Sequence, residues 1–201
     1  INHAVNAINL ASQPNTARFF LRKIFLDIFF AIFSTGVAMI CNALFLVDNA
    51  GVIHWDPYLK RHLVPFGEYV PMREVIMTLI PPLAEVSALD GDVTPGVDSE
   101  LFETRWGEIG SLICFDSIYE TLALDSVRHG AQLLTVSTND SWFFDSAAAR
   151  MHNAQAQLRA VETGRWIVRA ASTGISSIIA PDGTIVARQD ALTEGILYGE
   201  V

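Results

Sequence analysis

Residues 28–47 form a run of twenty residues without a formal charge, IFFAIFSTGVAMICNALFLV. A run of this length is long enough to cross a bilayer as one helix, so the chain must place it either in a membrane or in a large core. Polar or flexible residues interrupt it at 34–36 and at Asn42. They favour a split interpretation, in which a helix ends near Phe33 and two short apolar strands follow a turn.

The remaining composition is that of one globular domain. Of 201 residues, 51% are hydrophobic and 17% are charged, which excludes a disordered or low-complexity chain. The net charge of −9 argues against nucleic-acid binding, because proteins that bind nucleic acid carry clustered positive charge. Two cysteines, Cys41 and Cys114, are too few for a disulfide framework. The chain opens with Ile1-Asn2-His3 and no signal-peptide pattern, so we expect it to be an internal piece of a longer protein.

Apolar periodicity predicts an α/β chain with a mixed sheet, because strand and helix alternate through the middle and hairpins close the end. Helices are expected over 16–33, 118–129 and 147–163, and loops over 56–71 and 81–96. Strands are expected over 43–48, 52–54, 108–114, 132–137, 166–171, 175–180 and 184–187, with turns at 49–51 and 181–183.

The third helix has the clearest pattern. One apolar stripe runs over four turns, and Gly164 follows as a stop; the stripe consists of Ala147, Met151, Ala154, Leu158 and Val161. Two charged positions nearby also carry expectations. Arg169 lies in an apolar strand and should meet a buried carboxylate. Glu162 should pair with Arg159 or Arg165 on the helix surface.

Cys114 is the candidate nucleophile. It ends a predicted strand, and Phe115-Asp116-Ser117 leads into a helix, so the thiol should project from the edge of the sheet. The backbone N–H of Phe115 can then point at the oxyanion of an acyl intermediate, and a helix N-terminus lowers the pKa of a thiol. A buried structural cysteine is the alternative at this position, and it is the interpretation we favour for Cys41.

A cysteine nucleophile needs a base and an oxyanion partner. None of the five histidines has metal-ligand spacing to another His or Cys, so no metal site is expected. The G-x-S-x-G, P-loop and G-x-G-x-x-G patterns are absent from the sequence. The alternative to histidine is Lys60, with Glu68 eight residues later in a loop rich in Pro, Gly and aromatic residues. A solvated surface lysine is the competing interpretation.

Four segments carry a resemblance. They read KRHLVPFGEYVP from Lys60, ICFDSIYE from Ile113, TNDSWF from Thr138 and AQLRAVETGRWIVRAASTGISSIIAPDG from Ala156. Together they resemble the nitrilase superfamily and, more narrowly, the catalytic domain of the apolipoprotein N-acyltransferase family. The K-x-H-L-x-P core alone indicates only the superfamily, whereas V-P-F-G-E-Y-V-P, N-D-S-W-F and L-R-A-V-E-T-G-R are more specific. The resemblance runs from about Ser34 to the end of the chain.

The resemblance implies roles for individual residues. Cys114 matches the family's nucleophile, Lys60 its catalytic lysine and Glu68 the second glutamate of its site. Asn2 stands where the family has its general-base glutamate. An amide cannot accept a proton at neutral pH, so this departure puts the activity of the chain in question. Partial substitution by Glu68 and a non-enzymatic remnant are both open alternatives.

The resemblance also implies a group that binds the oxyanion or the substrate. Phe115 and Asp116 fall where the family has an aromatic and an acidic residue after the cysteine. Trp142 falls on the aromatic residue of N-D-x-W-F, where it is either core or a lid of the acyl pocket. His62 belongs to the K-x-H-L-x-P core.

The implied fold is α/β, a four-layer α-β-β-α sandwich over residues 1–201, lacking part of its N-terminal side. The implied reaction moves an acyl chain from a phospholipid, through a cysteine thioester, to the α-amino group of a diacylglyceryl-cysteine lipoprotein, without metal or organic cofactor. In the family this domain lies outside the cytoplasmic membrane, held there by membrane helices that this chain does not include. An amidase-type carbon–nitrogen hydrolase is the alternative, in which water takes the acyl group.

Overall fold

The computed structural model describes residues 6–11, 18–23, 29–34, 37–48, 50–79, 92–144 and 146–201. Its helices are α1 (Arg73–Leu79), α3 (Glu120–Arg128) and α4 (Ala147–Thr163), with 3₁₀ helices η1 (Cys114–Ile118) and η2 (Ser141–Phe143). Its first six strands are β1 (Asn6–Ala11), β2 (Arg18–Lys23), β3 (Phe29–Ser34), β4 (Val37–Val47), β5 (Ile53–Leu59) and β6 (Leu101–Thr104). The others are β7 (Gly107–Ile113), β8 (Leu133–Thr138), β9 (Trp166–Ala171), β10 (Ser176–Ile179), β11 (Ile185–Gln189) and β12 (Ile196–Glu200).

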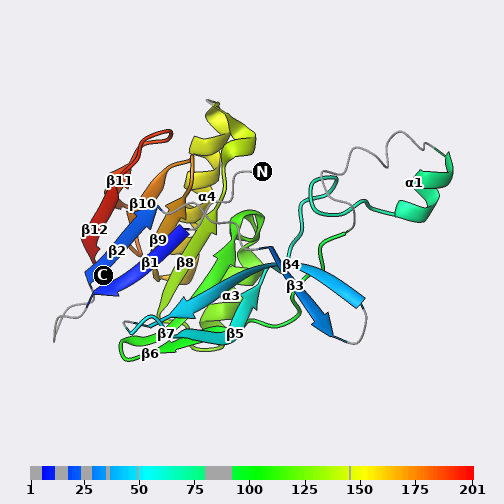
Figure 1. The fold of residues 1–201 in the computed structure, drawn as a ribbon. Helices are drawn as coiled ribbons and strands as arrows, with labels where there is room; N and C mark the ends of the chain where they lie inside the picture. The colour runs from blue at the N-terminus through cyan, green and yellow to red at the C-terminus, as the bar shows by residue number, and fades with distance from the viewer. Residues whose placement is uncertain are drawn as a thin grey trace.

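A six-stranded mixed sheet in the order β11-β10-β9-β8-β7-β6 forms the centre of the fold (Figure 1). Its three middle strands are parallel, β7 to β8 and β8 to β9, and the outer strands pair antiparallel. Parallel strands end at the same edge of a sheet, so the residues that follow β7, β8 and β9 come together there.

Helices cover one face of this sheet and strands cover the other. Ala123 of α3 and Ala156 and Ala160 of α4 are fully buried in one core cluster with Leu112 and Leu134 of the sheet. The opposite face carries Ile109, Leu133, Val168, Ala170 and Ile178. The sheets β1-β2-β12 and β3-β4-β5 contact this second side. The described residues therefore form an α-β-β arrangement, consistent with the predicted α-β-β-α sandwich.

The uncharged run is two strands, β3 and β4, paired antiparallel. The expectation of strands in this run is confirmed only in part, because one continuous strand, β4, stands where two short strands were expected. The predicted helix over 16–33 is wrong. Its described residues form β2, which pairs with β1 and β12, and β3. Phe and Ile dominate this segment, and such residues suit strands. None of the described helices is long and apolar enough to span a membrane.

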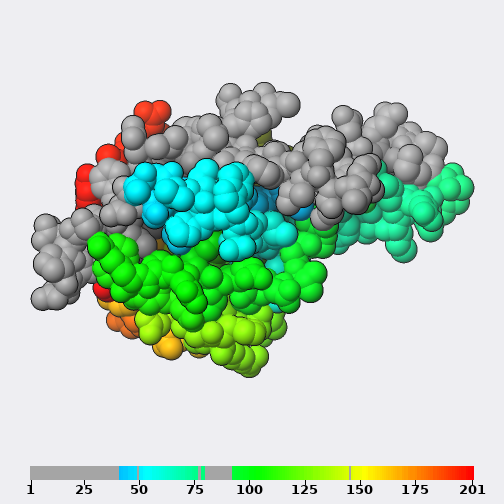
Figure 2. All heavy atoms as spheres, turned by 60° about the horizontal axis from the view of Figure 1, so that its bottom comes forward, coloured from blue at the N-terminus to red at the C-terminus, as the bar shows by residue number. Residues whose placement is uncertain are grey.

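The later elements are confirmed with small changes of boundary. Ala50 and Gly51 lie between β4 and β5, where a turn was expected, and Gly183 has a φ of +84° in the turn between β10 and β11. The predicted loop over 56–71 begins later, because β5 continues to Leu59 through Pro57. A proline is compatible with this strand, since β5 lies at the edge of its sheet. The predicted loop over 81–96 lies mostly outside the described residues. Helix α1 lies away from the sheets (Figures 1 and 2).

Helix α4 is confirmed, with Ser146 capping its start and Gly164 ending it at a φ of +62°. Its apolar stripe, however, does not face the sheet. Leu158 is 50% exposed, and Met151 and Val161 are more so. The buried face consists of small and polar side chains, namely Ala149, His152, Asn153, Ala156, Arg159 and Ala160. The helix therefore packs closely against the sheet through alanines, and it brings polar groups inside.

The exposed apolar stripe and the buried alanine face of α4 give a test of the packing. Leu158→Gln should change the free energy of unfolding by less than about 0.5 kcal/mol, because the side chain is half in water. Ala160→Leu on the same helix should lower it by about 1–3 kcal/mol, because it overpacks a closed core. Urea unfolding followed by circular dichroism measures both. The reverse ranking of the two variants would contradict this orientation of α4.

Candidate active site

Cys114 lies directly after β7 as the first residue of η1. Its backbone φ is +50°, in the left-handed region, which costs a residue with a side chain about 1–2 kcal/mol. The residue is half-buried rather than enclosed. A strained corner of this kind turns the chain sharply at the sheet edge, so the thiol is set apart from the strand that carries it.

Two other strands end beside this corner. Thr138 is the last residue of β8 and Ala171 the last of β9, and the N–H of Ser172 donates to the carbonyl oxygen of Thr138 at 3.0 Å. The Ser172 hydroxyl donates to Oδ1 of Asn139 at 2.8 Å. These bonds tie the ends of β8 and β9 together on the edge where Cys114 stands.

Lys60 and Glu68 form a buried ion pair in the loop after β5. Nζ of Lys60 donates to both carboxylate oxygens of Glu68, at 2.8 and 2.7 Å, and Lys60 is only 1% exposed. The N–H of Val64 and the side-chain amide of Asn42 donate to the same carboxylate, at 2.8 and 3.3 Å. The interpretation of Lys60 as a solvated surface lysine is therefore wrong. Its ammonium group is desolvated, paired and held in one place.

The carboxylate of Asp116 joins this loop to the nucleophile corner. Oδ1 accepts from the backbone N–H of His62 at 2.7 Å, and Oδ2 accepts from the Tyr58 hydroxyl at 2.9 Å and from the N–H of Ile113 at 3.1 Å. Asp116 is fully buried. Burial raises the pKa of its carboxyl, although the two backbone N–H groups and the hydroxyl oppose the rise. Both oxygens are occupied by the chain itself, so the geometry makes Asp116 a positioning group.

The environment of Cys114 has opposing effects on the pKa of its thiol. Burial raises its pKa above the ordinary value, and the carboxylates of Asp140 and Glu68 add to the rise. The charge of Lys60 and a hydrogen bond with Thr138 act in the opposite direction without overcoming burial. The expected lowering by a helix N-terminus is therefore outweighed, and the thiol depends on a proton acceptor for its activation. Asn2, at the position expected for that base, lies outside the described residues.

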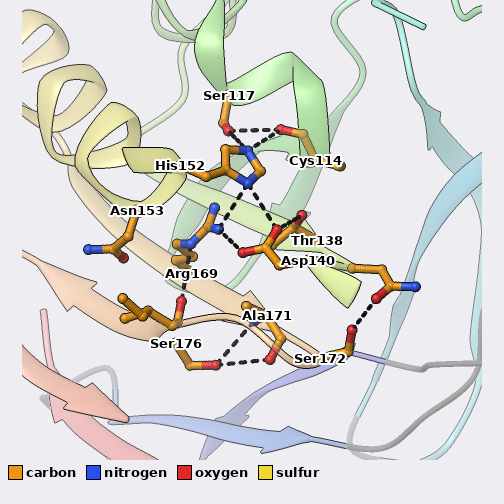
Figure 3. Close-up of polar contacts among 12 residues, drawn as sticks. Cys114, Ser117, Thr138, Asp140, His152, Asn153, Arg169, Ala171, Ser172 and Ser176 are labelled. Carbon is orange, nitrogen blue, oxygen red and sulfur yellow. Dashed lines mark hydrogen bonds and ion pairs between the residues drawn. The ribbon is translucent and has the colours of Figure 1, made fainter. Parts of the chain in front are cut away.

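Behind Cys114 lies a buried polar cluster, which consists of Asp140, His152, Arg169 and Thr138 (Figure 3). Asp140 accepts from Thr138 at 2.8 Å, His152 at 2.9 Å and Arg169 at 2.7 Å. Burial alone would raise the pKa of Asp140, but these three partners hold it below its ordinary value. The expectation that Arg169 meets a buried carboxylate is confirmed.

The sequence patterns did not identify His152 and Ser117, whose side chains contact the carbonyl oxygen of Cys114. Both nevertheless had a weak signal. His152 lies on the side of α4 opposite the apolar stripe, and Ser117 follows Cys114 by three residues. The expected pair of Glu162 with Arg159 is also confirmed, at 2.6 and 2.7 Å, although Arg159 itself is buried.

The remaining predicted residues are Trp142, His62 and Phe115. Trp142 is 66% exposed in η2, so it is not core. The ring of His62 stacks at a tilt on Tyr119, with centroids 4.1 Å apart, and Phe115 meets the same ring edge-on at 5.5 Å. Within the described ranges, no group of three or more His, Cys, Asp or Glu side chains could hold a metal ion.

The charge of Lys60 gives a prediction for Cys114. Lys60→Met should move the pH midpoint of Cys114 alkylation by iodoacetamide upward by about one pH unit, because it removes a cation and leaves the Glu68 carboxylate unpaired. The rate is followed by mass spectrometry of the Cys114 peptide. Arg188→Gln, which removes an exposed cation on β11, is the matched control and should leave the midpoint in place. A midpoint that stays or falls in the Lys60 variant would contradict the assignment.

Residues 23–201 match the family described as carbon–nitrogen hydrolase. The chain is 44% identical over 142 residues to a protein of Geobacter metallireducens named apolipoprotein N-acyltransferase, covering 71% of this chain and 26% of that protein. It is 40% identical over 145 residues to the protein of the same name from Azotobacter vinelandii, covering 72% and 27%. The chain thus spans about a quarter of the length of these relatives.

Solved structures share the fold. Nit3 of Saccharomyces cerevisiae, a member of branch 10 of the nitrilase superfamily, has a TM-score of 0.59 at 23% identity, covering 81% of this chain and 53% of Nit3. The NitFhit protein of C. elegans has a TM-score of 0.62 at 23% identity, covering 81% and 38%. Fold, motifs and family match agree, and the chain belongs to the carbon–nitrogen hydrolase family, with relatives named apolipoprotein N-acyltransferase.

Proposed function

We propose that this chain is the catalytic domain of an acyltransferase. It would move an acyl chain from a phospholipid to the α-amino group of a diacylglyceryl-cysteine lipoprotein, by way of a thioester on Cys114. The observation that carries the proposal is the buried Lys60–Glu68 pair, which Asp116 ties to the strained nucleophile corner. The names of the relatives at 38–44% identity support the choice of reaction.

In the first step the sulfur of Cys114 attacks the carbonyl carbon of the phospholipid ester. A C–S bond forms, and the carbonyl oxygen becomes an oxyanion that Lys60 and the N–H of Phe115 stabilise. The C–O bond then breaks, and the lysophospholipid alkoxide leaves. The thiol proton goes first to Glu68 and from there to the alkoxide, since the amide of Asn2 cannot accept it.

In the second step the α-amine of the lipoprotein attacks the thioester carbon. A C–N bond forms, the C–S bond breaks, and the proton lost by the amine returns to the sulfur through Glu68. No metal or organic cofactor takes part in either step. The reaction is a ping-pong acyl transfer, in which the thioester is the shared intermediate.

Exposed apolar side chains support a lipid substrate. Phe144 is 82% exposed and Trp142 66%, both close in sequence to Asp140, and Phe66 is exposed in the loop between Lys60 and Glu68. A contiguous apolar patch on a protein surface marks a site that binds lipid or protein, and we propose that these three side chains belong to one. We assign these side chains to the acyl chain of the donor, and the reaction to the cytoplasmic membrane, with the domain on its extracytoplasmic face.

An amidase-type hydrolase is the second candidate. The match to the carbon–nitrogen hydrolase family favours it, because the same thioester would form and water would take the acyl group. The two candidates differ only in the acceptor. A phospholipid donor incubated with and without a diacylglyceryl-cysteine peptide separates them, since transfer yields acylated peptide and hydrolysis yields free fatty acid.

The thioester itself is the main prediction. Incubation with a fluorescent phospholipid should add the mass of one acyl group to Cys114, and Cys114→Ala should remove it. Asn2→Glu should speed the acylation by at least tenfold, because it supplies a carboxylate base. Acylation found only in the Asn2→Glu variant would support an inactive remnant instead. No acylation in either form would overturn the proposed function.

The exposed aromatic residues give a second prediction. The double change Trp142→Ser and Phe144→Ser should raise KM for phospholipid vesicles about tenfold, because it removes two apolar contacts with the acyl chain. The corresponding effect on a short water-soluble ester should be smaller. Val186→Ser, at a half-exposed position on β11, is the control. Equal effects on both esters would contradict the assignment to the acyl chain.

A further inference from the structure

The carbonyl oxygen of Cys114 is held from inside the protein. The Ser117 hydroxyl donates to it at 2.8 Å, and Nε2 of His152 lies 3.2 Å from it. The same Nε2 lies 3.1 Å from the Ser117 hydroxyl oxygen, so the three groups form a closed set (Figure 3). Ser117 and His152 are both buried. One backbone oxygen, on the residue that carries the nucleophile, therefore has two buried side-chain partners.

The imidazole of His152 is fixed on its other side. Nδ1 faces Oδ1 of Asp140 at 2.9 Å, and Nε2 faces the carbonyl oxygen of Cys114 at 3.2 Å. Both oxygens can only accept, so in this arrangement the ring donates from both nitrogens. Oδ2 of Asp140 accepts from Arg169 at 2.7 Å, and Nε of Arg169 donates to the carbonyl oxygen of Ile175 at 3.1 Å. Asp140 is fully buried, so turning the ring would remove a hydrogen bond from a carboxylate that water cannot reach.

Fixing the carbonyl oxygen of Cys114 also fixes the direction of the next backbone N–H. The carbonyl oxygen of Cys114 and the N–H of Phe115 belong to one planar trans peptide group, and they point in opposite directions. Holding the oxygen inward toward Ser117 and His152 therefore directs the N–H away from them. That plane can rotate through ψ of Cys114 and φ of Phe115, so it needs an anchor to keep the N–H in one direction.

We infer that His152 and Ser117 are positioning residues that fix the Cys114–Phe115 peptide plane and so aim the oxyanion donor. The inference rests on the proposed function, because it concerns the oxyanion of acyl transfer. His152 is not the general base in this arrangement. Its Nε2 contacts the carbonyl oxygen, and the sulfur of Cys114 points away from the ring (Figure 3).

Two reactions at the same sulfur test the inference. Acylation by p-nitrophenyl acetate passes through an oxyanion, whereas alkylation by iodoacetamide forms no oxyanion. Both require the thiolate, so the ratio of the two rates at one pH cancels any change in its population. If a substitution damages the fold or displaces the sulfur, both rates fall. If it only misdirects the N–H of Phe115, the acylation rate alone falls.

Three variants and one control apply this test. Ser117→Ala and His152→Asn should each lower the acylation rate of Cys114 by about tenfold or more, with alkylation within about threefold. His152→Gln places an amide N–H near the position of Nε2 and should recover most of the acylation rate. His129→Gln, the same exchange at a 60% exposed histidine, should change neither rate.

The outcomes decide between the alternatives. Unchanged acylation in Ser117→Ala and His152→Asn, or a parallel fall of both rates, would overturn the inference. If His152→Asn fails to fold, Ser117→Ala decides alone, because it removes one hydroxyl. Wild-type protein that is acylated by p-nitrophenyl acetate but not by phospholipid would refute the acyltransferase proposal and leave the positioning test intact. Wild-type protein that is alkylated but never acylated would overturn the inference itself.

Discussion

The carboxylate of Asp116 is the interaction on which the arrangement of the site depends. It accepts hydrogen bonds from β5, from the loop that follows β5 and from the end of β7. The loop carries Lys60 and Glu68, and β7 leads into Cys114, so one buried group sets the nucleophile relative to the cation. Fifty-four residues separate Asp116 from His62, and no local pattern could close that distance.

Two ion pairs lie in the site. Lys60 lies with Glu68, and Arg169 lies with Asp140. Removing one partner from such a pair typically costs about 3–5 kcal/mol, because the other charge stays buried alone. Both pairs also act electrostatically on the thiol of Cys114, so charges that stabilise the fold contribute to its chemistry.

Much of the fold could be predicted from local pattern, and the failures have physical reasons. Alternation of strand and helix from 107 onward is clear in the sequence, because turns and glycine stops separate the elements. The segment 16–33 was misassigned because its apolar residues fit helical spacing and strands equally well. Helix α4 was recognised by a stripe that faces outward, since its inner face uses alanines for close packing and polar groups for buried bonds.

The sequence by itself determined the elements from β7 to β11, the position of Cys114 after a strand, and the Lys60–Glu68 spacing within one loop. These depend on short-range backbone preferences and on residues close together in the chain. Only the tertiary structure decided that the Asp116 carboxylate accepts hydrogen bonds from Tyr58, His62 and Ile113. It also decided that His152 and Ser117 contact the carbonyl oxygen of Cys114. These contacts bring together residues up to 58 positions apart, and their geometry follows from how sheet and helix pack. Hydrogen bonds are directional, so their partners become definite only when the layers are in place.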